Sequence, residues 1–346
     1  MGSPRRARDN PLSVSVGQLH LANPTILASG VLGVTSGGLV KAWRGGAGAV
    51  VTKTVGTTGQ PGYAGPRIAG LEGNSLINAM GLPNPGVDGY LPEVKEACAQ
   101  GIVVIGSVMG NSPEEFASVA SKLAAAGVAA IELNVSCPHV GSIYLLGLQP
   151  DHVADVVSAV SKQVGRAFPV WVKLPGSTDY PRLVTVAKAA EAAGASAVVA
   201  INTLPALVLD VDTQRPILGG QIGGLSGPAI RPVAVRAVWE LHRASLGIPI
   251  VGAGGVLAGR DIVEFLLAGA SAVEIGTGVL YRGATIFAEV CRELREYMRR
   301  HKVKTLSSLV GAAHVAAAPT SQASASCSSP DEANKETSTR TCGCGG

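Results

Sequence analysis

The chain has 346 residues, of which 47% are hydrophobic and only 4% aromatic, and its formal net charge is +4. This length suits one large α/β barrel domain with extensions, and the aliphatic composition is typical of parallel strands that are buried on both faces. The excess positive charge lies near the N-terminus and in the segment 295–304, which favours solvated termini and a solvated helix face over a nucleic-acid-binding patch.

No apolar run reaches the roughly 18 residues that a membrane-spanning helix needs. The first ten residues are polar and basic, without the apolar core of a signal peptide. The six cysteines are spread along the chain and do not form the framework of a small disulfide-rich domain. We therefore expect a cytoplasmic protein with reduced cysteines that binds neither a membrane nor nucleic acid.

Short aliphatic runs alternate with amphipathic segments along most of the chain. The alternating pattern of residues 12–23 predicts a β-hairpin that turns at Gly17 and Gln18. The runs predicted to be strands are 25–30, 47–54, 102–109, 129–136, 169–175, 197–203, 248–255 and 272–278. The segments predicted to be helices are 113–126, 151–164, 181–193, 230–244, 260–268 and 285–300. Three helices are expected to end in Ala-Gly, where the glycine adopts the left-handed conformation of a helix C-cap.

Strands that alternate with helices form parallel sheets through helical crossovers. Eight such units favour a closed (β/α)8 TIM barrel over an open doubly wound sheet, and the first strand-to-helix turn lacks a Gly-x-Gly-x-x-Gly motif. The hairpin is expected to cover the barrel floor, and two long excursions, 55–90 and 204–226, are expected to be active-site loop insertions. We expect a flexible N-terminus over 1–10, the barrel over 11–313 and a disordered tail over 314–346.

Polar and glycine-rich segments follow the predicted strands, at the end of a barrel where ligands bind. The last two strands end in the glycine-rich segments 252–255 and 276–278. Such turns let backbone N–H groups approach an anion closely, so they predict a phosphate site, with ordinary tight turns as the alternative.

Lys53 and Lys173 end two predicted strands among apolar neighbours. A buried lysine without a partner is unfavourable, so each either faces a developing anion in a site or forms a structural ion pair with Glu132 or another core acid. Cys137 follows the fourth predicted strand. Its position alone fits a general base and a small packed side chain equally well.

These strand-end motifs, in this order, resemble those of the dihydroorotate dehydrogenase family across roughly residues 11–300. The matching segments are 27–30 (LASG), 52–54 (TKT), 78–86 (NAMGLPNPG), 134–138 (NVSCP), 172–174 (VKL), 201–203 (INT), 224–228 (GLSGP), 252–256 (GAGGV) and 276–277 (GT).

The resemblance implies an enzyme that oxidises dihydroorotate to orotate in pyrimidine biosynthesis, with one FMN per subunit bound in the barrel. The residues that it implies for FMN binding are Ser29, Lys53, Thr54, Ser107, Asn134, Lys173, Ile201, Gly227, Gly254, Gly255, Gly276 and Thr277. Those implied for substrate binding are Lys53, Asn78, Ala79, Met80, Gly81, Leu82, Asn134, His139, Asn202 and Thr203. Ser107 and His139 stand where the family often has asparagine.

The resemblance also implies catalytic roles for Cys137, Lys53 and Lys173. Cys137 takes the place of the base that removes the C5 proton while hydride leaves C6 for the flavin, and Lys173 stabilises the reduced ring. A cysteine at this position resembles the soluble branch of the family, and the 224–232 stretch most resembles its NAD-linked class. There the barrel subunit pairs with a subunit that carries FAD and an iron–sulfur cluster, so we expect such a heterotetramer or a homo-oligomer.

Alternative hypotheses are another FMN-dependent barrel enzyme, such as a dihydropyrimidine dehydrogenase-like enzyme or a dihydrouridine synthase, and a flavin-binding subunit without catalytic activity. The synthase hypothesis requires an RNA-binding extension with a basic face, which the sequence does not show. A protein without flavin would instead be a phosphate-binding lyase or isomerase. Cys342 and Cys344 in the tail make an incomplete metal site, so no metal is expected.

Overall fold

The computed structural model describes residues 10–135 and 146–316, and within these ranges eight parallel strands close into a barrel. The barrel strands are β3 (Thr25–Leu27), β4 (Ala49–Val51), β7 (Val104–Val108), β8 (Ala130–Asn134), β9 (Val170–Lys173), β10 (Ala197–Ala200), β15 (Ile250–Ala253) and β16 (Ala272–Ile275). Each strand lies inside one of the eight predicted runs, and β16 pairs with β3 to close the barrel. The predicted TIM barrel is therefore confirmed.

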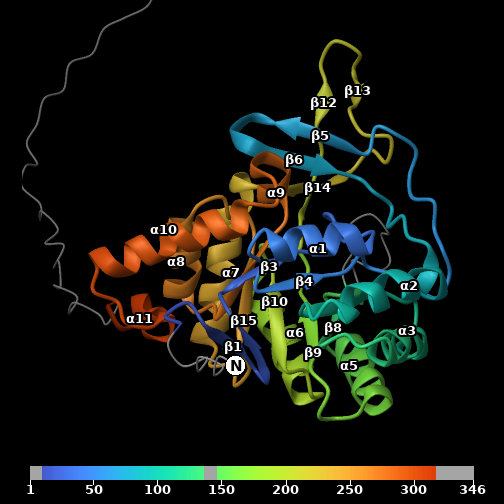
Figure 1. Ribbon diagram of the computed structural model, residues 1–346. Coiled ribbons are helices and arrows are strands. Elements are labelled where there is room, and N and C mark those ends of the chain that lie inside the picture. Colours follow the sequence, from blue (N-terminus) through green and yellow to red (C-terminus); the bar gives the residue numbers. More distant parts are fainter. Residues whose placement is uncertain (1–9, 136–145, 317–346) are drawn as a thin grey trace, which may run out of the picture.

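Helices cover the outside of the barrel (Figure 1). They are α1 (Ser36–Arg44), α2 (Gly86–Ala99), α3 (Pro113–Ala125), α5 (Pro150–Val164), α6 (Tyr180–Ala192), α7 (Arg231–Arg243), α8 (Gly259–Ala268), α9 (Thr277–Arg282), α10 (Ile286–Arg300) and α11 (Ala312–Ala316). All six predicted helices are present, with bounds shifted by one residue at most. The helices that sequence patterns missed include α1, which opens with two glycines, and α2, which contains Pro92; both residue types disfavour helix.

Hydroxyl and glycine caps are present at the ends of several helices. The hydroxyl of Ser112 caps α3 by accepting a hydrogen bond from the Glu115 backbone N–H at 3.4 Å. Gly127, Gly194 and Gly269 follow α3, α6 and α8 with φ values of 99°, 106° and 119°. These positive φ values turn the chain back toward the next barrel strand, as the Ala-Gly pattern predicts.

The hairpin predicted near the N-terminus consists of β1 (Val14–Val16) and β2 (Leu19–Leu21), paired antiparallel. Val16 and Leu21 are buried in the same apolar cluster as Trp171 and Val251 of the barrel strands. Gly17 lies against the backbone of Ser196, immediately before β10. Because these contacts lie at the amino ends of the strands, the hairpin closes the barrel floor, as predicted.

The two predicted excursions meet in a second, antiparallel sheet, which Figure 1 shows beside the other end of the barrel. Its strands, in spatial order, are β11 (Leu204–Ala206), β14 (Gly223–Ser226), β6 (Ser75–Asn78) and β5 (Ile68–Leu71). The hairpin β12 (Leu209–Asp210) and β13 (Arg215–Pro216) projects from the second excursion. In the register, Gly224 is paired with Asn78. The sheet therefore fixes residues from two distant excursions next to one another, which no local pattern predicts.

None of the helices in the described ranges is long and apolar enough to cross a bilayer. The predicted segments 1–10 and 314–346 fall almost entirely outside these ranges, so the domain boundaries stay predictions.

One close contact between barrel and helix layer provides a test of this packing. A Cβ atom added at Gly252 of β15 would lie 2.4 Å from Cδ1 of the fully buried Phe265 of α8. We expect Gly252→Ala to lower the free energy of unfolding by about 1–3 kcal/mol, because an overpacked core forces side chains or backbone to shift. Urea unfolding measures this change.

Two further variants serve as controls for this test. Gly37→Ala, at an exposed position of α1 where an added Cβ meets nothing, is expected to leave stability unchanged or slightly raised. Combining Gly252→Ala with Phe265→Leu should cost less than the sum of the two single changes, because the smaller side chain leaves room for the methyl group. If the losses in free energy of unfolding of the two single variants add up in the double variant, the contact between residues 252 and 265 does not limit the packing.

Candidate active site

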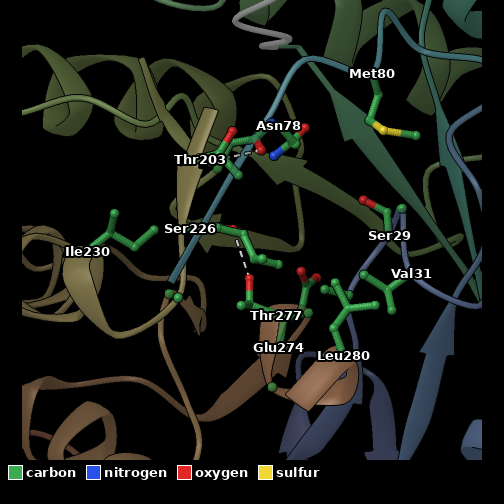
Figure 2. A pocket seen from close by; sticks show the side chains of 18 of the residues that line it. Ser29, Val31, Asn78, Met80, Thr203, Ser226, Ile230, Glu274, Thr277 and Leu280 are labelled. Carbon is green, nitrogen blue, oxygen red and sulfur yellow. Dashed lines mark hydrogen bonds between the residues drawn. The ribbon is translucent and has the colours of Figure 1, made fainter. Parts of the chain in front are cut away.

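The carboxyl ends of the barrel strands and the second sheet enclose a cavity of about 340 Å³. This volume falls in the range of small-molecule sites, roughly 300–1,000 Å³. Its lining includes polar residues from six barrel strands or the turns that follow them, and apolar residues such as Val31, Leu76 and Leu280. Figure 2 shows Ser29 and Val31 on one side, Ser226 and Ile230 on the other, and Asn78 close to Thr203.

A buried ionic cluster forms part of the cavity floor. Lys173, at the end of β9, donates a hydrogen bond to Oε2 of Glu274 from β16, and its Nζ lies 3.9 Å from Oε2 of Glu132 from β8. The three side chains are at most 7% exposed. Burial alone would lower the pKa of Lys173, but the two carboxylates outweigh burial and raise it. Lys173 therefore stays positively charged beside the cavity.

Glu132 has the opposite tendency to its partner lysine. Burial, together with the negative charge of Glu274, raises the pKa of Glu132 well above its ordinary value, and the charge of Lys173 offsets this only in part. The cluster thus contains two carboxyl groups and one lysine in a region from which water is largely excluded. Such an arrangement favours the protonated form of one acid.

A chain of hydrogen bonds leads from this cluster to the upper part of the cavity. The Ser107 hydroxyl donates to Oε1 of Glu132 at 3.3 Å and lies 2.8 Å from the Thr54 hydroxyl. Asn134 donates its amide to Thr54 at 3.4 Å and accepts from the Asn202 amide at 3.3 Å. Side chains from β7, β8 and the ends of β4 and β10 are thereby held in fixed orientations around the cavity.

One end of the cavity is built from glycine turns. Gly254 and Gly255 follow β15 with φ values of 146° and 72°, and an added Cβ at Gly255 would lie 2.6 Å from the carbonyl oxygen of Gly227. Gly276 immediately precedes α9, and the Thr277 hydroxyl donates to Ser226 at 2.8 Å. Turns after the seventh and eighth strands that lead into a short helix are a frequent phosphate site of TIM barrels.

The opposite end carries amide and hydroxyl groups at the edge of the second sheet. Asn78 donates its side-chain amide to the carbonyl of Gly224 at 3.1 Å, and the Thr203 backbone N–H donates to Oδ1 of Asn202 at 2.8 Å. Lys53, only 6% exposed, reaches the same cavity from the end of β4. The cavity thus offers cations, amides that donate and accept hydrogen bonds, and glycine turns of the kind that often bind phosphate in TIM barrels.

Most of the residues predicted for the site are brought together. Those that line the cavity are Ser29, Lys53, Thr54, Asn78, Met80, Leu82, Asn134, Lys173, Ile201, Asn202, Thr203, Gly227, Gly254, Gly255, Gly276 and Thr277. Ala79, Gly81 and Ser107 do not line it; Ser107 lies behind Thr54, fully buried. Cys137 and His139 lie outside the described residues.

Glu274 was not predicted, although the sequence carries a signal for it: an acid inside the aliphatic run 272–275. Ser226 and the apolar wall formed by Val31, Leu76 and Leu280 were not predicted either. Within the described parts of the chain, no group of three or more His, Cys, Asp or Glu side chains could hold a metal ion.

Comparisons with known proteins point to one family. The family model described as dihydroorotate dehydrogenase matches residues 11–298. The NAD(+)-linked dihydroorotate dehydrogenase B catalytic subunits of Methanocella arvoryzae and Methanocaldococcus jannaschii are 46% and 43% identical to this chain, and each alignment covers 88% of this chain and 98% of the relative. A crystal structure of the Eimeria tenella dihydroorotate dehydrogenase with ferulenol has a TM-score of 0.78 at 22% identity, covering 89% of this chain and 90% of that one, which shows the same fold.

The raised pKa of Glu132 predicts how stability depends on pH. Because folding makes this acid harder to ionise, its contribution to stability is full below the pKa of an unfolded glutamate and is lost as pH rises toward its folded pKa. Glu132→Gln removes this loss, so its stability relative to the wild type should rise between pH 5 and pH 8. The rise is at most about 1.4 kcal/mol per pH unit for one proton.

Urea unfolding of both proteins across this pH range measures the effect. Glu264→Gln, the same chemical change at a carboxylate that is 49% exposed, is the matched control. A stability difference that does not change with pH would contradict the raised pKa.

Proposed function

The chain belongs to the dihydroorotate dehydrogenase family, and on this premise we propose that it oxidises dihydroorotate to orotate, with bound FMN as the hydride acceptor. The observation that carries the proposal is the meeting of Lys53, Lys173, Asn134 and Asn202 in one cavity at the carboxyl ends of the barrel strands. This reaction forms the pyrimidine precursor orotate, so the protein acts in pyrimidine biosynthesis.

The residues that line the cavity suit the chemistry of FMN. The glycine turns after β15 and β16, with Gly255 and Gly276, suit the phosphate, and apolar side chains such as Leu76 and Val31 suit a flat ring. Thr54 and Asn134 offer hydrogen bonds to the ring edge, and Lys173 offers a buried cation. FMN, when bound, supplies the site that accepts two electrons as hydride.

The chain's own side chains bind and orient the substrate in this proposal. Lys53 pairs with the substrate carboxylate, and Asn78, Asn134 and Asn202 match the alternating donors and acceptors of the pyrimidine edge. Lys173 places its charge where negative charge develops during reduction, which stabilises the transition state most effectively in a water-poor site. Ser107 supports this set from behind, through Thr54.

We assign the role of base to Cys137, which follows Asn134 by three residues. Its thiolate would take the C5 proton of dihydroorotate. His139, two residues further on, is proposed as an additional hydrogen-bond donor to the substrate.

The fate of the electrons forms a further part of the proposal. The relatives are named as catalytic subunits of NAD(+)-linked enzymes, which implies a partner subunit. We propose that electrons pass from FMN to NAD through a partner that carries FAD and an iron–sulfur cluster, in a heterotetramer located in the cytoplasm. FMN is then the one flavin of this chain.

Anaerobic titration of the purified protein with dihydroorotate tests the proposed function. We expect a yellow protein whose flavin absorbance bleaches on addition of dihydroorotate, whereas turnover of uracil without bleaching by dihydroorotate would indicate a dihydropyrimidine dehydrogenase-like activity. A yellow protein that dihydroorotate does not bleach would support a non-catalytic flavin-binding subunit. A colourless protein would leave a phosphate-binding lyase or isomerase.

Replacing the proposed base should slow flavin reduction. We expect Cys137→Ala to lower the rate of bleaching by dihydroorotate about 10²–10⁴-fold, as loss of a positioned proton acceptor does. In the wild type, the rate should rise with pH through the thiol pKa, which is near 8.5 for a free cysteine. Anaerobic stopped-flow absorbance measures both effects.

Cys98→Ala is the matched control, because Cys98 is a half-buried thiol of α2 that does not line the cavity. It should leave the rate unchanged. Equal rates for Cys137→Ala and the wild type, or a rate independent of pH from 6 to 10, would remove Cys137 from the mechanism.

A further inference from the structure

Glu132 and Glu274 have no role in the proposed mechanism, yet they are buried beneath the cavity and are here called the acid pair. Glu274 holds Lys173 by a direct hydrogen bond, and Glu132 approaches the same nitrogen at 3.9 Å. Figure 2 shows the carboxyl group of Glu274 pointing toward the cavity. Acids in such a position act directly on the charge that Lys173 presents to a ligand.

The buried cluster of Lys173, Glu132 and Glu274 contains more acidic groups than basic ones. If both acids were ionised, these three side chains would carry a net charge of −1, because Lys173 is the cation that the ion pairs of the described residues place beside the two acids. An unpaired buried charge is strongly unfavourable. The barrel strands adjacent to the pair, β7, β3 and β15, contribute no charged residue within their bounds. Lys53 lines the same cavity from the end of β4.

Two carboxyl oxygens of the pair lack a hydrogen-bond donor. Oε2 of Glu132 and Oε1 of Glu274 are buried and accept no hydrogen bond from the described part of the chain. The other two oxygens accept from Ser107 and Lys173. An ionised carboxylate only accepts hydrogen bonds, whereas a protonated one carries a donor of its own. A single proton on the pair therefore supplies the donor that these oxygens lack.

We propose that Glu132 and Glu274 share one proton and act as positioning residues for Lys173, so that the cluster is neutral before the reaction and Lys173 can lend its charge to reduced FMN. In this arrangement Glu274 holds Lys173 through their hydrogen bond, and Glu132 carries the proton. The proposal rests on the proposed function, because FMN is the group that receives the charge of Lys173.

The direction of the pKa of Glu132 agrees with this arrangement. Burial is the largest cause of the increase, the negative charge of Glu274 adds to it, and the charge of Lys173 offsets it only in part. Ser107 acts in the other direction, because its hydroxyl donates to Oε1 of Glu132 and stabilises the ionised form.

Infrared spectroscopy of the full-length protein tests for the shared proton directly. We expect the wild type, labelled with carbon-13 glutamate, to show the carbonyl band of a protonated carboxylic acid at neutral pH, with a shift in D₂O. Glu132→Gln and Glu274→Gln should each abolish the band, because the remaining acid then ionises opposite Lys173. The exposed control Glu264→Gln should keep it. A wild-type spectrum without a band that either substitution removes would overturn the proposal.

The midpoint potential of bound FMN tests the effect on Lys173. If the pair shares a proton, replacing one acid leaves the other ionised opposite Lys173, so the cluster stays neutral in each single variant. The equilibrium between oxidised and reduced FMN should then change less than threefold at pH 7. The double variant Glu132→Gln/Glu274→Gln leaves Lys173 with no acid partner. It should favour reduced FMN at least tenfold, which is an upward shift of about 30 mV for a two-electron couple.

The outcomes separate this proposal from the proposed function. A shift of tenfold or more in either single variant would show that both acids are ionised in the wild type, and an unchanged potential in the double variant would show that they do not control the charge of Lys173. Either result overturns the proposal. Failure of dihydroorotate to bleach the flavin would refute the proposed function, whereas the infrared band reports the shared proton without any substrate.

Discussion

The buried contact between Lys173 and Glu274 marks the level at which the barrel changes from a packed core into a binding site. Below it, Trp171 and aliphatic side chains fill the interior, and above it polar side chains such as Asn134 join apolar ones in the lining of the cavity. A cation can remain at this depth only because carboxylates lie beside it. The strands of the barrel supply both, Lys173 from β9 and the acids from β8 and β16. The same side chains thus stabilise the interior and give the cavity its charge.

The barrel could be predicted from the sequence because its strands are buried on both faces. Such strands are continuous aliphatic runs, so all eight were found, and the polar residues directly after them marked the cavity. Predicted strands such as 272–278 were too long, because the chain leaves the sheet after Ile275 and begins α9 at Thr277. Sequence patterns cannot separate a barrel strand from the turn that follows it when both are apolar and rich in glycine.

Other features depend on contacts between distant segments, which local patterns do not contain. The pairing of Gly224 with Asn78 joins two excursions that are 146 residues apart, and neither excursion alone predicts the sheet that results. Glu274 was missed for a related reason, since its partner Lys173 is 101 residues away. An ion pair of Lys173 with Glu132 or another core acid was the alternative to a role in the site, and the structure has both Glu132 and Glu274 beside Lys173. Ser107, which was predicted to bind the cofactor, does not line the cavity itself and links Glu132 to Thr54 by hydrogen bonds.

The hairpin of β1 and β2 adds a further closure at the amino end of a barrel whose interior is already packed. Because Val16 and Leu21 plug the amino end of the barrel, a small molecule has no route through the axis. Small molecules therefore reach the cavity from the carboxyl end of the barrel, where the strand ends line it. Electrons are not bound by this restriction, since they can cross a protein wall without a channel. The packed amino end of the barrel therefore excludes small molecules but does not prevent electrons from leaving in that direction.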